Sequence, residues 1–294
     1  MTLKVKQKED YADRATPVVE SKVTDKAAAD VEKPYADKDT KFVNITSDIT
    51  SDFLFYPFDT LSIRPFTLGC LRKIFRAVSQ HKLSHMVEVI SFSIDPDKSA
   101  MDLTAQDFWS LMFWERINSY KKAPYRVTFN CLDNGHKAKV ASGELAPDTL
   151  ANEIVVKNTG ELEVKHLDKV AVSEWIKKVQ EEYNISLYPA RASDLVELEE
   201  LQEKMELDED KEEIAWIAQL ASNLSKAHGQ TLAERIDFLT KEELSPDLKN
   251  DIEKFIELAD HGIRETLTVK CAGCGVSRKE ELSFDVLSFF PVGD

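Results

Sequence analysis

The chain has 294 residues, of which 53 are acidic and 38 are basic, so its formal net charge at pH 7 is -15. Binding to phosphate backbones or anionic lipids needs a surplus of Lys and Arg, so this balance argues against a general nucleic-acid or membrane-surface binder. No apolar run approaches the length of a transmembrane helix, and the N-terminus lacks the apolar core of a signal peptide. Four cysteines are too few for a disulfide framework, which is typical of a cytosolic protein.

Residues 1–42 are predicted to form a disordered or partner-draped arm. They are rich in Lys, Asp, Glu, Ala and Thr and show no apolar periodicity. Such a segment cannot bury enough apolar surface to offset the entropy lost on ordering.

Residues 43–190 are predicted to form an α+β core with packed helices. Apolar residues at helical spacing predict helices over 67–78, 82–90 and 104–120. Thr104 is the expected N-cap residue of the third helix, with Asp107 three positions further on.

The second half of this core is expected to contain small β-hairpins. Asp133-Asn134-Gly135 supplies turn residues between two alternating runs, so 125–140 is predicted to be a hairpin. Strands are expected at 153–156 and 161–167, joined by a turn at 158–160. Ser173 is the expected N-cap of a helix over 174–183.

Residues 191–262 are predicted to form an acidic helical segment, because residues 191–260 carry 20 acidic and 8 basic side chains. Thr231 and Glu234 form a capping box, and Ser245-Pro246 begins a last helix, with Gly262 expected as the C′ residue that follows its end. The apolar seams are Leu198, Leu201 and Met205, then Ile214, Ile217, Leu220 and Leu224. The acidic side chains have two interpretations: solvated helix faces, or a surface that meets a basic partner.

Residues 263–294 are predicted to form a C-terminal β-hairpin that packs back on the core and carries Cys271-Ala-Gly-Cys274-Gly. Two cysteines at this spacing, with glycines that permit a tight turn, form half of a zinc site. A thioredoxin-like dithiol is the competing interpretation. That motif lies between a strand and a helix, whereas strand-like sequence flanks this one on both sides.

Cys131 and His136 are the best candidates for the other half of the site, because they bracket the turn of the first predicted hairpin. Two facing hairpin tips would make a zinc-ribbon-like unit with a structural Zn2+ held by Cys131, His136, Cys271 and Cys274. The alternatives are a metal held by other ligands, or free thiols beside turn-forming glycines. His81 and His85 have the i, i+4 spacing of metal ligands but lack the acidic residue of a catalytic zinc motif.

The sequence contains no phosphate-binding loop, dinucleotide fingerprint or nucleophile elbow. Its nine glycines leave little material for loops that cradle phosphates. We therefore predict that the chain is not an enzyme and has no catalytic residues.

Three stretches of the chain form a pattern. The first is LSIRPFTLG, an apolar strand followed by Arg-Pro and a helix. The second is a helix and strand marked by Asp107-Phe108, Arg116, Ser119-Tyr120, Pro124 and Cys131. The third is the terminal CxxCG, followed by a strand and Phe289-Phe290-Pro291. Together these stretches resemble the T-even-type bacteriophage baseplate hub and tail assembly protein family, whose pattern carries a second CxxC where His136 follows Cys131 in this chain.

The resemblance implies a structural or assembly component of a phage tail baseplate that binds other tail and hub proteins, in symmetric multiple copies. Its expected location is the virion tail, or the host cytoplasm during assembly. A second interpretation is a zinc-ribbon adaptor that binds transcription proteins or nucleic acid. Lys270, Arg278 and Lys279 favour it, and Glu280 and Glu281 oppose it. A third is a thiol oxidoreductase that uses the two cysteines of the CxxC motif.

Overall fold

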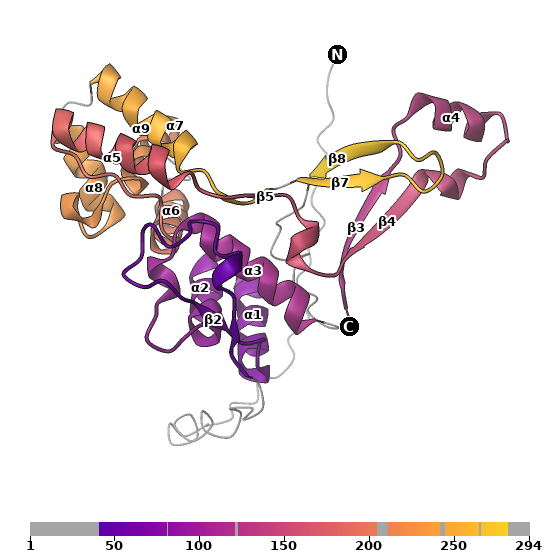
Figure 1. The fold of residues 1–294 in the computed structure, drawn as a ribbon, viewed down its shortest axis with the longest axis horizontal. Helices are drawn as coiled ribbons and strands as arrows, with labels where there is room; N and C mark the ends of the chain where they lie inside the picture. Colours follow the sequence, from indigo (N-terminus) through magenta and orange to yellow (C-terminus); the bar gives the residue numbers. More distant parts are fainter. Residues whose placement is uncertain are drawn as a thin grey trace, which may run out of the picture. The chain divides into compact units, whose positions relative to one another are not determined.

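The computed structural model describes residues 41–80, 82–120, 123–204, 211–241, 245–264 and 266–281. These residues form an α+β fold of helices and small antiparallel hairpins, as predicted (Figure 1). Residues 1–40 of the predicted arm, His81, Met205 and Phe289-Phe290-Pro291 lie outside the described residues. The domain boundaries proposed from the sequence stay predictions.

The helices of the described residues begin close to the predicted positions in several cases. The α-helices are α1 (Leu68–Gln80), α2 (Leu83–Ser93), α3 (Ala105–Ser119), α4 (Asn134–Ala141), α5 (Lys169–Tyr183), α6 (Ala192–Lys204), α7 (Lys211–Ser222), α8 (Leu232–Lys241) and α9 (Pro246–Leu258). Short 3-10 helices lie at η1 (Thr46–Asp48), η2 (Ala100–Asp102), η3 (Pro147–Leu150), η4 (Thr159–Glu161) and η5 (Lys226–His228). None of the described helices is long and apolar enough to cross a membrane.

Side-chain caps explain three of these helix starts and confirm the corresponding predictions. Thr104 Oγ1 accepts a hydrogen bond from the Asp107 backbone N–H at 3.2 Å at the start of α3. At α9, Ser245 Oγ accepts one from the Leu248 N–H at 3.1 Å. The hydroxyl of Thr231 accepts one before α8. Each cap satisfies an N–H group that has no partner inside its helix.

The strands pair as two-stranded antiparallel sheets (Figure 1). The pairs are β1 (Val43–Asn44) with β2 (Ser62–Ile63), β3 (Tyr125–Asn130) with β4 (Ala151–Val156), β5 (Val164–Lys165) with β6 (Gly262–Ile263), and β7 (Thr266–Lys270) with β8 (Ser277–Glu281). The β7–β8 pair is the C-terminal hairpin expected around the CxxC motif.

The prediction of a first hairpin over 125–140 is wrong. Strand β3 pairs instead with β4, with Tyr125 opposite Val156, and the segment between them contains helix α4. The reason is local: Asp133 Oδ1 accepts a hydrogen bond from the His136 N–H at 2.7 Å, so Asp133 caps a helix rather than forming a turn. Cys131 therefore lies at the end of a strand and His136 in the first turn of a helix.

Three smaller predictions are also corrected. Only Val164–Lys165 of the segment 161–167 forms a strand, and it pairs with β6 instead of with 153–156. Helix α5 begins earlier than Ser173, because Asp168 accepts hydrogen bonds from the N–H groups of the first helical turn. Helix α9 ends at Leu258 with Ala259 as its C-cap, so Gly262 is not the C′ residue; it pairs in β6 with a φ of 101°.

Two clusters of buried apolar side chains form the interior. The first joins α1, α2, α3, β3 and β4, and it includes Leu267 and Val269 from β7. The second joins α5, α7, α8 and α9. Val127 and Phe129 of β3 share the first cluster with the two β7 residues. Apolar burial therefore holds the β3–β4 pair and the β7–β8 hairpin together, side by side in Figure 1.

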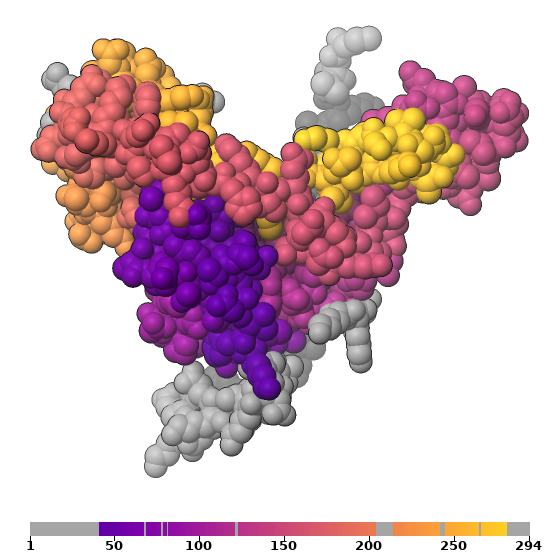
Figure 2. All heavy atoms as spheres, viewed as in Figure 1, coloured from indigo at the N-terminus to yellow at the C-terminus, as the bar shows by residue number. Residues whose placement is uncertain are grey.

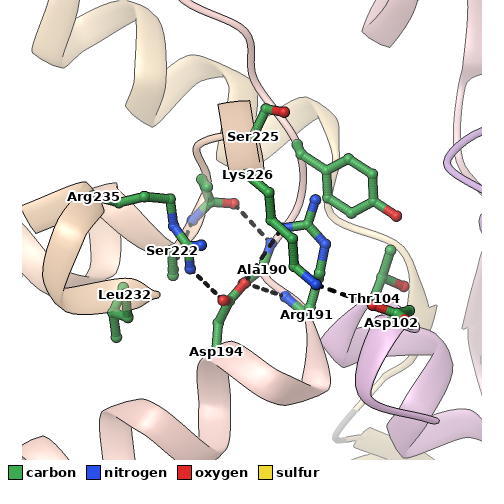
Figure 3. Close-up of polar contacts among 12 residues, drawn as sticks. Asp102, Thr104, Ala190, Arg191, Asp194, Ser222, Ser225, Lys226, Leu232 and Arg235 are labelled. Atoms are coloured by element: carbon green, nitrogen blue, oxygen red, sulfur yellow. Dashed lines mark hydrogen bonds and ion pairs between the residues drawn. The ribbon is translucent and has the colours of Figure 1, made fainter. Parts of the chain in front are cut away.

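A buried ion pair links the helices of the acidic segment (Figure 3). The guanidinium of Arg235, on α8, is fully buried and pairs with Asp194 on α6. Arg235 Nε also donates to the Ala221 carbonyl of α7 at 3.1 Å. One side chain therefore joins three helices.

Candidate metal centre

The structure brings the four predicted ligand residues together beside the end of β3 and the turn between β7 and β8. The ligand atoms of Cys131, His136, Cys271 and Cys274 all lie within 4.8 Å of one another. The Cys131 and Cys274 sulfurs are 3.6 Å apart, and Cys271 Sγ is 3.4 Å from His136 Nδ1. Figure 2 shows the atoms of β7–β8, in yellow, against those of the β3–β4 pair and α4, in magenta.

These distances fit a tetrahedral metal site. Zinc–sulfur bonds of about 2.3 Å and zinc–nitrogen bonds of about 2.0 Å place two sulfurs about 3.8 Å apart and a sulfur and a nitrogen about 3.5 Å apart. The Cys131–Cys274 separation of 3.6 Å and the Cys271–His136 separation of 3.4 Å are close to these values.

The CxxC turn is shaped by its backbone. The Gly275 N–H donates to the Cys271 carbonyl at 2.8 Å, and the Cys271 N–H donates to the Val276 carbonyl at 3.0 Å. Gly275 has a φ of 74°, a conformation that residues with a Cβ rarely adopt. This turn directs both thiols of the motif to the same side.

Gly273 is required for a different reason, namely the close approach of the imidazole. A Cβ at this position would lie 2.5 Å from His136 Cε1. Any side chain there would displace His136 or the turn. Gly273 thus permits the close contact between the two halves of the centre.

A hydrogen bond fixes the tautomer of His136. Its Nε2 is 3.1 Å from Thr149 Oγ1, and that hydroxyl donates its own hydrogen to the Ala146 carbonyl at 2.6 Å. The hydroxyl must therefore accept from an Nε2–H group. In the neutral imidazole this makes Nδ1 the unprotonated nitrogen, and Nδ1 lies 3.4 Å from Cys271 Sγ. A neutral imidazole held in this way is the form that binds a metal.

Asn152 of β4 connects the two halves. Its Oδ1 accepts from the Ala272 N–H at 2.9 Å, and its Nδ2 lies 3.6 Å from Cys271 Sγ. Sequence reasoning missed both Thr149 and Asn152, because their roles depend on the β3–β4 pairing, and no local spacing marks them.

One thiol of the motif, that of Cys271, is placed to hold negative charge. Burial alone would raise the pKa of Cys271, but the backbone N–H groups of Cys274 and Gly273 outweigh it and lower that pKa to about 6. A hydrogen bond from the Val276 N–H lowers the pKa of Cys274, but burial and the neighbouring thiols together outweigh it and raise that pKa. Cys274 therefore keeps its proton, whereas Cys271 ionises near neutral pH. A thiolate is the form of Cys that binds metals.

The remaining described histidines lie elsewhere. His85 Nε2 contacts Gln80 Oε1 at 2.8 Å, and His228 Nε2 accepts from the Ser186 N–H at 2.8 Å. His261 is buried beside Thr104, with 3.1 Å between its Nε2 and the hydroxyl. Each of these three has a polar partner, and His166 is exposed.

Comparisons of the chain with protein-family models, with curated proteins and with solved structures found no match.

Proposed function

We propose that this chain is a non-enzymatic binding protein whose β-hairpins are held together by a structural zinc ion, and that it serves as a structural or assembly component of a phage tail baseplate. The observation that carries the zinc proposal is the convergence of Cys131, His136, Cys271 and Cys274, with His136 Nε2 bonded to Thr149 and Nδ1 beside Cys271. Cys131 and Cys271 are buried and Cys274 is partly exposed.

The ligand set favours a structural ion over a catalytic one. Four protein ligands fill a tetrahedral shell and leave no position for a reactive water, unlike catalytic zinc sites with three protein ligands. Zinc bound here would connect β3 and α4 to the β7–β8 turn, segments far apart in the sequence. Since the unfolded chain has no preformed site, the free energy of binding would add to the free energy of unfolding.

The baseplate proposal rests on the three stretches that resemble the hub family, and their contacts support it. The Phe66 N–H, in the first stretch, donates to Ser119 Oγ of the second at 2.9 Å. Cys131, which ends the second stretch, lies 3.6 Å from Cys274 of the third. The stretches that carry the resemblance therefore contact one another, as the parts of one functional unit would.

The two alternatives have less support. Lys279 pairs with Glu163 at 2.8 Å and Arg278 with Glu280, so two of the three cations that would favour nucleic acid near the CxxC turn already have acidic partners. A thiol oxidoreductase needs an accessible thiolate, whereas Cys271 is only 2% exposed.

Quantitative mass spectrometry of purified phage particles from the source that encodes this chain tests the baseplate role. Recovery at a copy number that matches three- or six-fold tail symmetry would make it a baseplate component. Absence from particles, with capture on hub proteins in infected cells, would make it an assembly factor. Absence from both would contradict the baseplate proposal and favour the zinc-ribbon adaptor.

A further inference from the structure

The four ligand residues of the metal centre differ in their access to solvent. Cys131, His136 and Cys271 are buried. Cys274 is partly exposed, because it lies in the turn between β7 and β8, and the glycines on either side of it are exposed as well. One sulfur of the centre is therefore open to a small molecule in solution.

This exposed sulfur lies against a second, buried sulfur. Cys274 Sγ is 3.6 Å from Cys131 Sγ. A disulfide bond is about 2 Å long, so two sulfurs already in contact need only a short movement to form one. Cys131, at the end of β3, is thus placed to react with any oxidised form of Cys274.

The third sulfur of the centre, that of Cys271, is held by several nitrogen atoms. It is 3.4 Å from His136 Nδ1 and 3.6 Å from Asn152 Nδ2. The backbone N–H groups of Gly273 and Cys274 also donate to it. No nitrogen of the described residues contacts the Cys131 sulfur in this way, so Cys131 is the freer partner for Cys274.

We propose that Cys274 is an oxidation site at which hydrogen peroxide converts the zinc centre into a disulfide between Cys131 and Cys274. Oxidation is fastest at an accessible thiolate that lies next to a second cysteine, and Cys274 meets both conditions when zinc holds it as a thiolate. The inference rests on the zinc ion of the proposed function and describes how that site is regulated.

The conversion takes two steps. First, the Cys274 sulfur attacks one oxygen of the peroxide; an S–O bond forms, the O–O bond breaks and hydroxide leaves. Cys274 is then a sulfenic acid. Second, the Cys131 sulfur attacks Cys274 Sγ; the S–S bond forms, the S–O bond breaks and a second hydroxide leaves. The two sulfurs lose two electrons, the peroxide oxygens gain them, and the hydroxides take up protons to become water.

The disulfide replaces the metal as the joint between distant parts of the chain. Loss of two of the four ligands releases the zinc ion, because a structural site needs all four. The new bond still connects the end of β3 to the β7–β8 turn, which are 143 residues apart along the chain. Such a crosslink restricts the unfolded chain, so the oxidised protein keeps its stability without zinc.

The proposed function gives this conversion a place. Disulfides are rare in the reducing cytosol and persist on virions and outside cells. A baseplate component that is assembled in the cytosol and leaves it in a particle passes from one condition to the other. The zinc form would then serve assembly, and the disulfide form would serve the released particle.

Treatment of the zinc-loaded full chain with a small molar excess of hydrogen peroxide, without reductant, tests the inference. A chromophoric indicator follows the release of zinc, and mass spectrometry of alkylated peptides locates the disulfide. We expect zinc to leave at the rate at which the Cys131–Cys274 bond forms, and reductant with added zinc to restore the starting form. The oxidised, zinc-free protein should melt at a higher temperature than the reduced, zinc-free protein.

Two variants identify the reactive sulfur. Cys274→His keeps a zinc ligand at this position and removes the exposed thiol, so peroxide should release its zinc at least about tenfold more slowly. Cys70→Ser changes a buried cysteine outside the centre and is the matched control, which should release zinc like the wild type. If Cys274→His binds no zinc, the disulfide map of the wild type still decides.

Three results would overturn the inference: a wild type that keeps its zinc in peroxide, a disulfide between Cys271 and Cys274 instead, or a zinc-loaded Cys274→His that loses the ion as fast as the wild type. All three begin from a chain that has bound zinc, so they leave the proposed zinc centre intact. A wild type that binds no zinc before peroxide is added would contradict the zinc centre itself, and the inference with it. The two failures are therefore distinguishable.

Discussion

Among single residues, Thr149 has the clearest effect on the chemistry of the metal centre without being a ligand. Its hydroxyl accepts from His136 Nε2–H because its own hydrogen is committed to the Ala146 carbonyl. Removing the hydroxyl would allow the imidazole to rotate or to carry its proton on Nδ1. Either change opposes metal binding.

Thr149→Val should therefore weaken zinc affinity by about 10- to 100-fold while the four ligands remain. Competition against a chromophoric chelator measures the affinity. Thr128→Val, at an exposed position of β3, is the control and should bind like the wild type. Equal affinities for both variants would show that Thr149 does not position the imidazole.

Glu115 of α3 is a second residue whose environment sets its protonation. It is fully buried; Oε2 accepts from Ser119 Oγ at 2.6 Å and from the Phe66 N–H at 3.2 Å, whereas Oε1 has no hydrogen-bond partner among the described residues. Burial raises its pKa to about 8, although these hydrogen bonds and the charge of Arg64 lower it. Burial raises the pKa of nearby Tyr120 to about 12, so Tyr120 stays neutral at the pH values at which Glu115 ionises.

The pH dependence of stability should report this carboxyl. The folded state holds the proton up to about pH 8, whereas the unfolded chain releases it near pH 4.5. The free energy of unfolding should thus fall as pH rises from about 5 to 8, by at most about 1.4 kcal/mol per pH unit from this group. Urea unfolding of the wild type and of Glu115→Gln at several pH values measures it, and the variant should show a smaller decline. Parallel pH profiles for the two proteins would contradict this assignment.

Between elements, the buried Asp194–Arg235 pair joins α6 to α8 (Figure 3). Arg235 Nη1 also donates to the Gly229 carbonyl at 3.1 Å, in the loop before α8. A buried pair of this kind adds little net stability compared with apolar residues, but loss of one partner leaves an unpaired buried charge.

Asp194→Asn should destabilise the chain by about 3–5 kcal/mol for that reason. Asp237→Asn removes a carboxylate from the exposed pair with Lys241 on α8, and it should change the free energy of unfolding by less than about 1 kcal/mol. Chemical denaturation of both variants provides the comparison. Similar values for the two would mean that Arg235 finds another partner or is hydrated when Asp194 is neutral.

Local signals explain which elements could be predicted from the sequence. The caps Thr104 and Ser245 act through neighbouring N–H groups, so the sequence around each helix start contains the necessary information. Asp133-Asn134-Gly135 fits both a hairpin turn and a helix start, and the choice depends on the long-range pairing of β3 with β4. Composition and periodicity do not determine that pairing.

For the whole molecule, the α+β class and the four residues of the metal centre followed from the sequence, but the arrangement that joins them did not. Two hairpin tips were expected, whereas one half of the centre is a strand end and the first turn of a helix. The supporting residues Thr149 and Asn152 become visible only in three dimensions.

The measurement that tests the central claim most directly is the metal content of the purified full chain, followed by its thermal unfolding. We expect one zinc ion per chain, and Cys271→Ser should lose the ion and melt at a lower temperature, because metal binding is coupled to folding. Removal of the ion from the wild type with a chelator should lower its melting temperature toward that of the variant. A chain purified with reductant and zinc that contains no metal and melts like Cys271→Ser would contradict the account.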